Sequence, residues 1–311
     1  MGERFFSTLA RGVEEHMSYT IDSKTYEFDG GWGKLPKGYE FNRVAGVAVD
    51  GNDRVYVFNR SSHPMMIFDK DGDLVEAWDR EFIEPHGAHV DKDGNIYLVD
   101  RDTHVMEKFA PGGELLMTLG TKNEPSDTGG TGLGELVAKA GGPNNLPTGV
   151  VVSPEGNVFV SDGYANCRVH KYDADGNLLL SWGAPGKIEP GHFHLPHGIG
   201  MDNRGRILVC DRQNHRIQVF TQDGQHLDTW SGFRMPTAVV VGPDDTVYVS
   251  ELESRVSVVD GDGNVLSRWG GESSHDAGHF IAPHCIAVKS HGDVYVGEVL
   301  EGKRIQKFAR K

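Results

Sequence analysis

Short apolar stretches separated by glycine-containing turns recur along the chain from Arg43 to its C-terminal end. In each unit an apolar stretch ending near Asp is followed by a Gly turn and by a second stretch ending in an acid or Asn. A third stretch, another Gly turn and a closing aromatic residue complete the unit. Stretches of four to six such residues joined by Asp-Gly or related turns are typical of β-hairpins. Each unit therefore predicts a small antiparallel sheet of four strands.

This pattern occurs six times. The units open with the segments RVAGVAVDGNDRVYVFNR, EPHGAHVDKDGNIYLVDR, LPTGVVVSPEGNVFVSDGY, LPHGIGMDNRGRILVCDR, MPTAVVVGPDDTVYVSE and APHCIAVKSHGDVYVGE. Four-stranded units of about 40 to 60 residues are typical of β-propellers, in which each unit forms one blade. We therefore expect an all-β fold, a six-bladed β-propeller.

The ends of the units indicate how the ring closes. The closing residues of the first five units are Trp78, Leu119, Trp182, Trp230 and Trp269. The sixth unit ends at Lys311 after three predicted strands and has no closing residue. The remaining tryptophan, Trp32, lies in the N-terminal segment YEFDGGWG. We expect this segment to supply the outer strand of the last blade, which removes a sheet edge, and the tryptophans to wedge between blades. Residues 1–18 would then be an N-terminal extension, and residues 19–311 a single propeller domain.

Two insertions interrupt the period, residues 120–145 between the second and third units and residues 183–194 before the fourth. Gly-rich insertions on a rigid ring are usually surface loops, but they are also where lids over binding sites occur. A lid role for residues 120–145 is therefore an open alternative to a purely structural one.

Composition narrows the class of protein. The chain has 311 residues, with 45 Asp and Glu against 31 Lys and Arg, and a formal net charge of −14 at pH 7. A nucleic-acid-binding protein usually presents a basic face, so we expect no nucleic-acid partner. No apolar run approaches the ~20 residues of a membrane span, and the three cysteines form no CxxC motif. We predict a cytoplasmic protein without membrane association, and its oligomeric state stays open.

Histidine occupies one position of the repeat in every second unit. Alignment of the six openings gives the column Ala45, His86, Thr148, His197, Thr237 and His284. The first strand of a propeller blade lines the central channel, so alternate blades place three imidazoles about 120° apart around the axis. A single such His would ordinarily be structural, but three at one repeat position predict a metal site. Three His with an open fourth position are typical of catalytic Zn²⁺, and Fe²⁺ and copper are the alternatives.

Two further columns follow the second strand of each unit. The first consists of Asn59, Asp100, Asp162, Asp211, Glu251 and Glu298. We expect this acidic column to be mainly architectural. The next position is arginine in three units only, at Arg60, Arg101 and Arg212. Because arginine binds carboxylates through two hydrogen bonds, these residues predict a small-molecule, anionic substrate, with ion pairs to the acidic column as the alternative.

The third unit departs from this pattern with the sequence SDGYANCR. We expect Gly163 to let the chain turn freely, and Tyr164 follows where the chain passes the channel mouth. A tyrosine close to a metal ion can act as a base or an acid. Beside the predicted His ring and the arginines, Tyr164 is therefore a candidate catalytic residue.

Several of these motifs resemble those of peptidyl-α-hydroxyglycine α-amidating lyases, which are six-bladed propellers of NHL-type repeats. The segments that carry the resemblance are FNRSSHP, EPHGAHVD, LPTGVVVSPEGNVFVSDGYANCRV, FHLPHGIGMD, CDRQNHRIQVF and APHCIAV. They lie within residues 40–308, and SDGY and PHG are the most specific of them.

The resemblance implies a role for individual residues. The ligands of a catalytic zinc ion would be His86, His197 and His284. Tyr164 would be the catalytic base, while Arg60 and Arg212 would bind substrate and stabilise developing charge. The implied reaction cleaves the C–N bond of a carbinolamide and releases a primary amide and glyoxylate or a related aldehyde.

Two positions depart from the family. Cys285 stands where the family has an aspartate that helps to hold a structural Ca²⁺, so a calcium site is not expected. Arg101 has no counterpart in the family motif, and we expect it to bind substrate and contribute to selectivity. A lactonase-like, metal-dependent hydrolase and a non-catalytic NHL binding module are the alternatives. The His column disfavours both, because lactonase-type propellers use carboxylate ligands and a scaffold needs no axial histidines.

Overall fold

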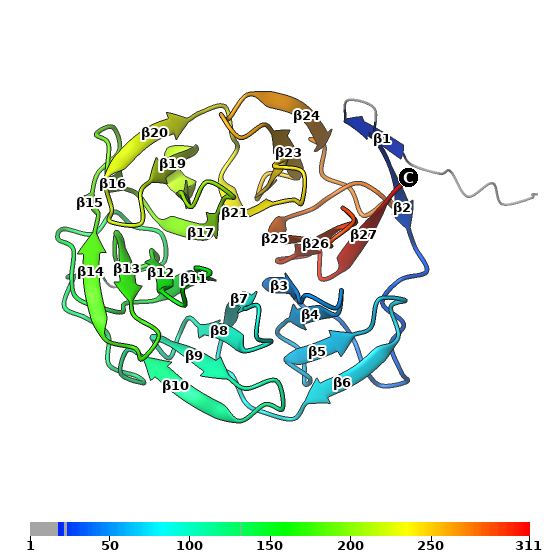
Figure 1. Cartoon of the computed structure of the whole chain (residues 1–311), viewed down its shortest axis with the longest axis horizontal. Coiled ribbons are helices and arrows are strands. Elements are labelled where there is room, and N and C mark those ends of the chain that lie inside the picture. Colours follow the sequence, from blue (N-terminus) through cyan, green and yellow to red (C-terminus); the bar gives the residue numbers. More distant parts are fainter. Residues whose placement is uncertain (1–17, 22–23, 131) are drawn as a thin grey trace, which may run out of the picture.

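Six antiparallel sheets surround a central axis in the computed structural model, which describes residues 18–21, 24–130 and 132–311 (Figure 1). The prediction of an all-β, six-bladed propeller is confirmed. Of the N-terminal extension expected over residues 1–18, residues 1–17 lie outside the described residues, and Ser18 already belongs to a strand. Within the described part of the chain, no helix has the length and apolarity that a membrane crossing requires.

The first three blades follow the chain from the axis outward. Blade 1 contains β3 (Gly46–Val49), β4 (Val55–Phe58), β5 (Met65–Phe68) and β6 (Leu74–Trp78). Blade 2 contains β7 (Pro85–Val90), β8 (Ile96–Asp100), β9 (Val105–Phe109) and β10 (Leu115–Leu119). Blade 3 contains β11 (Pro147–Val152), β12 (Val158–Asp162), β13 (Arg168–Tyr172) and β14 (Leu178–Trp182).

The remaining blades continue in the same sense. Blade 4 contains β17 (Pro196–Met201), β18 (Ile207–Asp211), β19 (Arg216–Phe220) and β20 (His226–Trp230). Blade 5 contains β21 (Pro236–Val241), β22 (Val247–Glu251), β23 (Arg255–Val259) and β24 (Val265–Gly270). Blade 6 begins with β25 (Pro283–Val288), β26 (Val294–Glu298) and β27 (Ile305–Arg310). Outside the blades lie the short parallel pair β15 (Ala184–Pro185) and β16 (His192–Phe193) and the 3₁₀ turn η1 (Arg212–Asn214).

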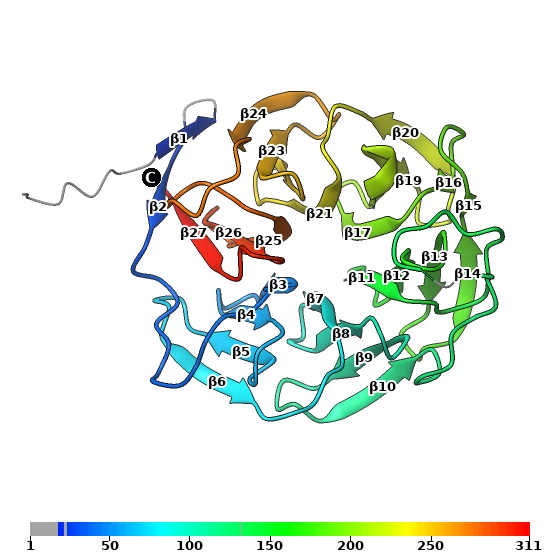
Figure 2. The ribbon, with the colours of Figure 1, turned by 180° about the vertical axis from the view of Figure 1, so that it is seen from behind.

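Blade 6 takes its outer strands from the N-terminal end of the chain. Strand β2 (Lys24–Asp29) pairs with β27, with Phe28 opposite Phe308, and β1 (Ser18–Ile21) pairs with β2 as a fifth strand. Figure 2 shows both N-terminal strands beside β27 at the edge of the ring. The two ends of the described chain are therefore joined by a β-ladder, which closes the ring and covers the edge that β27 would otherwise expose.

The hairpin turns follow from the residues that the sequence places in them. In the turn of blade 2, the Asp91 carboxylate accepts the N–H groups of Asp93 and Asn95 at 2.9 Å, and Gly94 adopts φ +82°. An aspartate that bonds to the backbone two residues on is a local turn former, and glycine adopts positive φ without strain. The repeated Asp and Gly residues are therefore what reverses the chain between the strands.

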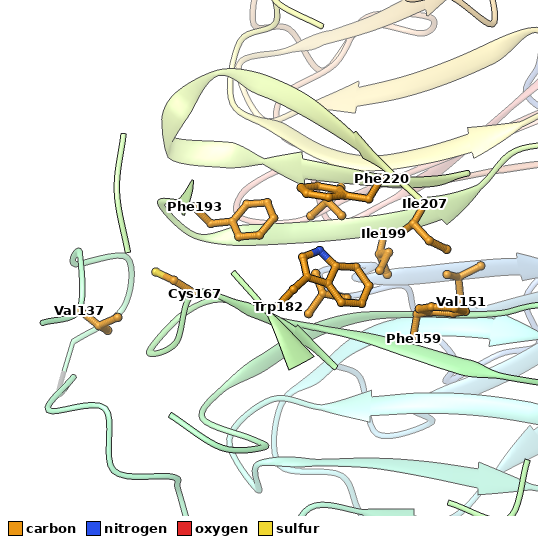
Figure 3. Close-up of a cluster of buried hydrophobic side chains, with 11 residues drawn as sticks. Val137, Val151, Phe159, Cys167, Trp182, Phe193, Ile199, Ile207 and Phe220 are labelled. Atoms are coloured by element: carbon orange, nitrogen blue, oxygen red, sulfur yellow. The ribbon is translucent and has the colours of Figure 1, made fainter. Parts of the chain in front are cut away.

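Large closing residues fill the spaces between neighbouring blades. Trp182 of blade 3 packs against Phe220 of blade 4, with ring centroids 5.9 Å apart, in the cluster drawn in Figure 3. A Cβ atom on Gly224, in the outer turn of blade 4, would lie 3.0 Å from the Trp182 ring. Trp32 packs in the same way against Phe68 of blade 1 and Tyr295 of blade 6. The predicted wedging is thus observed at the seam where the chain ends meet.

The acidic column fixes the approach to each first strand. The Asp100 carboxylate accepts the N–H groups of Ile83 and Glu84, at 2.9 and 2.8 Å. Asp211 accepts the N–H of His194 in the same way, at 2.8 Å. These carboxylates are almost completely buried, and such groups need hydrogen-bond partners. The column is architectural, as expected. It fixes the segment that precedes each first strand and thereby the position of that strand beside the axis.

Closure by β2 provides the first test of the fold. Tyr26 is fully buried in β2, and its hydroxyl lies 2.6 Å from that of Tyr248 while its ring packs on Trp269. We predict that Tyr26→Ala lowers the free energy of unfolding by about 3–5 kcal/mol, measured by urea denaturation. Val75→Ala, at a side chain 55% exposed on β6, should change it by less than about 0.5 kcal/mol. Equal small effects of the two substitutions would contradict a stabilising role for the closing strand.

Candidate metal centre

Three buried imidazoles meet at the axis of the ring. His86, His197 and His284 are each the second residue of a first strand, β7, β17 and β25, and each is at most 4% exposed. Their ring centroids are 4.7–4.8 Å apart, and one ring nitrogen of each lies within 4.8 Å of the others. The structure thus brings together the three histidines that the repeat alignment predicts, in a group that could hold a metal ion.

Hydrogen bonds to neighbouring blades orient all three rings. The Nδ1 atom of His86 lies 2.6 Å from the Thr148 carbonyl oxygen, and that of His197 lies 2.6 Å from the Thr237 carbonyl oxygen. His284 makes the equivalent contact with Ala45, at 2.9 Å. Because a carbonyl oxygen can only accept, each Nδ1 carries the proton and each Nε2 is unprotonated, with a lone pair. This arrangement is typical of histidines that bind a metal through Nε2.

The electrostatic environment keeps the imidazoles neutral. Burial, followed by the proximity of the other two histidines, lowers the pKa of His86 well below its usual value. Burial and then the Arg212 charge lower the pKa of His197 in the same direction. Burial and then the Arg60 charge lower the pKa of His284 to about 3. Neutral imidazole is the metal-binding form, so the donor set fits Zn²⁺, Fe²⁺ or copper.

Tyr164 lies directly beside two of these imidazoles. Its hydroxyl oxygen is 3.4 Å from Nε2 of His86 and 3.4 Å from Nε2 of His197, and the residue is 8% exposed. Arg212 donates a hydrogen bond from Nη1 to the same oxygen, at 3.1 Å. The phenol is therefore within reach of anything bound at the unprotonated Nε2 atoms.

Gly163 is needed here for a reason that the sequence did not reveal. The expectation that it lets the chain turn freely is wrong, because its φ is not in the positive range that favours glycine. A Cβ atom at this position would instead lie 1.9 Å from the carbonyl oxygen of Pro196, the residue before His197. Only glycine allows blade 3 to approach blade 4 this closely, and the approach brings Tyr164 to the histidines.

The three arginines surround Tyr164 but differ in their partners. Arg60 Nη1 lies 2.8 Å from a Glu84 carboxylate oxygen, and Arg101 Nε lies 2.7 Å from Asp102. Arg212 makes no ion pair within the described residues, and its buried Nε has no hydrogen-bond partner there.

The guanidinium carbons of Arg101 and Arg212 lie 4.9 and 5.1 Å from the Tyr164 ring centroid. None of the three arginines pairs with the acidic column, so the alternative of ordinary ion pairs to that column does not hold. Glu84 was not predicted as a site residue from the sequence, and it occupies a position that is apolar in blades 3 to 6.

The insertion over residues 120–145 packs on the segment that carries Tyr164. The Gly134 N–H lies 3.4 Å from the Tyr164 carbonyl oxygen, and the Gly134 carbonyl lies 3.1 Å from His194 Nε2. Thr128 donates a hydrogen bond to the Ala165 carbonyl at 2.6 Å. The insertion thus supports the Tyr164 segment from outside, while its role as a lid stays a prediction.

A channel continues along the axis behind the three histidines. Its cavity of about 290 Å³ is lined by the first strands, mainly by Val, Ala and Gly residues. His89 lines it, whereas His104 and His215 accept backbone N–H groups through Nδ1 and are structural. Burial lowers the pKa of His89 to about 4.

Comparisons with known proteins agree with this architecture. Residues 144–172 and 193–220 match the NHL repeat. The chain is 30% identical to NHL repeat-containing protein 3 of Mus musculus over 97% of its own length and 89% of that protein. It is 39% identical over 77 residues to the probable peptidyl-alpha-hydroxyglycine alpha-amidating lyase pgal-1 of Caenorhabditis elegans, covering 24% of this chain and 22% of that protein.

The fold of a streptogramin B lyase structure is also similar, with a TM-score of 0.64 at 14% identity over 92% of this chain and 98% of that one. Repeats and fold define the chain as an NHL-repeat six-bladed β-propeller. Within this class it belongs to the family of NHL repeat-containing protein 3. The resemblance to peptidyl-α-hydroxyglycine α-amidating lyases is confirmed at moderate identity.

His89 provides a test of the buried channel. Its pKa is lowered in the folded protein, so the unfolded chain binds a proton first as the pH falls below about 6.5, and this destabilises the fold. We predict that His89→Leu reduces the loss of unfolding free energy between pH 6.5 and 4.5 by about 2 kcal/mol. The control is His275→Leu, which removes an exposed imidazole that lies outside the channel and makes no ion pair within the described residues. Parallel profiles for wild type and His89→Leu would contradict burial of a neutral imidazole in the channel.

Proposed function

We propose that this protein is a zinc-dependent carbon–nitrogen lyase acting on a small, anionic carbinolamide of the α-hydroxyglycine type. The products would be an amide and glyoxylate or a related aldehyde. One observation carries the proposal: the Tyr164 hydroxyl lies 3.4 Å from the unprotonated Nε2 atoms of two imidazoles and accepts a hydrogen bond from Arg212. The named amidating lyases among the similar proteins support the reaction class.

The residues around Tyr164 suit this reaction. Cleavage removes the proton of the carbinol hydroxyl, forms a C=O bond, and sends the electron pair of the C–N bond to nitrogen, which then takes up a proton. Tyr164, in its phenolate form, would accept the hydroxyl proton as general base and could return it to the leaving nitrogen. Arg212 would hold the substrate carboxylate, and Arg60 would stabilise charge that develops in the transition state. When bound at the histidines, Zn²⁺ would supply Lewis acidity that stabilises negative charge on oxygen.

The donor atoms and the cysteines support further features of the proposal. Zn²⁺ is preferred to Fe²⁺ because the three donors are all imidazoles, whereas non-haem iron sites usually add a carboxylate. The metal-ligand cluster within the described residues contains no Asp or Glu, which disfavours a lactonase-like hydrolase. A cytoplasmic location is supported by the three cysteines, all of which are free and buried.

Metal content and aldehyde release test the proposal together. We expect about one equivalent of zinc per chain by mass spectrometry, and aldehyde release from α-hydroxyhippurate as a model carbinolamide. His197→Ala should lose the metal, while His226→Ala, at a histidine of the outer strand β20, should keep it. Tyr164→Phe should keep the metal but lower kcat by about 10² to 10⁴-fold. A folded wild-type protein that takes up no transition metal on reconstitution would contradict the proposal.

Arg101 should affect selectivity. Its guanidinium lies over the Tyr164 ring and is 11% exposed, so it borders the space that substrate would enter. We predict that Arg101→Ala changes the kcat/KM ratio between two carbinolamides with different acyl groups by about tenfold. Arg268→Ala, at an exposed arginine of β24, is the control. Unchanged kinetics on every substrate tested would show that Arg101 has no part in selectivity.

A further inference from the structure

Glu84 is an acid at a repeat position that is otherwise apolar in the blades with the same opening. The residues before the first-strand proline in blades 3 to 6 are Leu146, Leu195, Met235 and Ala282. Glu84 is held firmly, because its N–H bonds to Asp100 at 2.8 Å and its carbonyl accepts the Arg101 N–H at 3.1 Å. A carboxylate placed there by a rigid backbone has a defined position relative to the metal centre.

This carboxylate contacts two of the site arginines. One oxygen of Glu84 lies 2.8 Å from Arg60 Nη1 and 3.5 Å from Arg101 Nη2, and the side chain is 20% exposed. The next residue, Pro85, accepts a hydrogen bond from Arg60 Nε at 3.1 Å. The segment before His86 therefore holds Arg60 by both a side chain and a backbone group.

Other blades show why Arg60 bonds to the Pro85 carbonyl. In blade 3 the Thr148 hydroxyl bonds to the carbonyl of Pro196, and in blade 5 the Thr237 hydroxyl bonds to the carbonyl of Pro283. Blade 1 has Ala45 at this position, which has no hydroxyl, and Arg60 supplies the donor to the corresponding carbonyl instead. Arg60 is thus built into the seam between blades 1 and 2.

The three site arginines differ in whether a carboxylate balances their charge. The positive charges of Arg60 and Arg101 are balanced by Glu84 and Asp102, the latter 2.7 Å from Arg101 Nε. Arg212 has no ion-pair partner within the described residues, and its buried Nε is unpaired there. Of these three arginines beside the neutral histidines, only Arg212 is therefore available for one carboxylate of a ligand, and Arg43, whose charge also acts on Arg60, is exposed.

We propose that Glu84 is a positioning residue that neutralises Arg60, while Asp102 neutralises Arg101, and that Glu84 thereby limits the site to ligands with a single carboxylate, bound at Arg212. This inference rests on the anionic-ligand site of the proposed function. It adds that the substrate class is monoanionic, and that a ligand with a second carboxylate is excluded by the Glu84 charge rather than by lack of arginines.

Two small probes that differ by one carboxylate test this inference. Glycolate and its carboxylated analogue tartronate share an α-hydroxyl group and can be titrated calorimetrically into the zinc-reconstituted protein. In Glu84→Gln the charge of one arginine is no longer balanced, so we expect tartronate to bind about tenfold more tightly while glycolate affinity changes by less than about threefold. Glu84→Asp, which keeps the charge, should retain the preference of the wild type.

Glu81→Gln is the matched control, because it removes the same charge from an exposed acid of the same loop. It should leave the ratio of the two affinities within about twofold of wild type. A Glu84→Gln protein with an unchanged ratio, or a wild type that binds neither probe, would overturn the inference. A shifted ratio without aldehyde release from any carbinolamide would support the Glu84 inference and contradict the lyase reaction.

Discussion

The geometry of this protein depends on closing the ring of blades. Each blade buries its flanks only against two neighbours, so a ring with a free end would expose the Trp32 and Trp269 contacts of the last blade and the edge of β27. The ladder between β2 and β27 prevents this by joining the two ends of the chain. Because all six blades share one axis, closure also sets the diameter at which the first strands meet.

The positions of the three axial histidines depend on that diameter. Each axial histidine donates its Nδ1 proton to a carbonyl of the following blade, so the distance between adjacent first strands determines where the Nε2 atoms lie. The acceptors occupy the same repeat position as the histidines, which makes the arrangement repeat three times around the axis. Ligand orientation is therefore built into the backbone contacts between blades rather than into flexible side chains.

Charge is distributed unevenly around this centre. The protein as a whole is acidic, with a net charge of −14, yet three arginines lie beside the buried histidines. Two of them are balanced by nearby carboxylates, and the third, Arg212, bonds instead to the Tyr164 hydroxyl. The site can therefore attract an anion by local charge, while the rest of the surface has the opposite sign.

Features that repeat along the chain could be predicted from the sequence. The six blades and the convergence of His86, His197 and His284 followed from equivalent positions in successive units, because equivalent positions in a ring lie at equal height around the axis. The region around Tyr164 could be placed for the same reason, since SDGYANCR replaces a segment of known position in the other units.

What the sequence by itself determined was thus the blade count, the closing segment and the axial histidines, since these depend on local pattern and symmetry. Only the tertiary structure revealed contacts between residues of different repeat positions in different blades. Glu84 meets Arg60 across the seam of blades 1 and 2, and the Gly163 backbone approaches Pro196 too closely for a Cβ atom. Such contacts depend on how closely and at what angle neighbouring blades pack, and side-chain packing over the whole ring decides this.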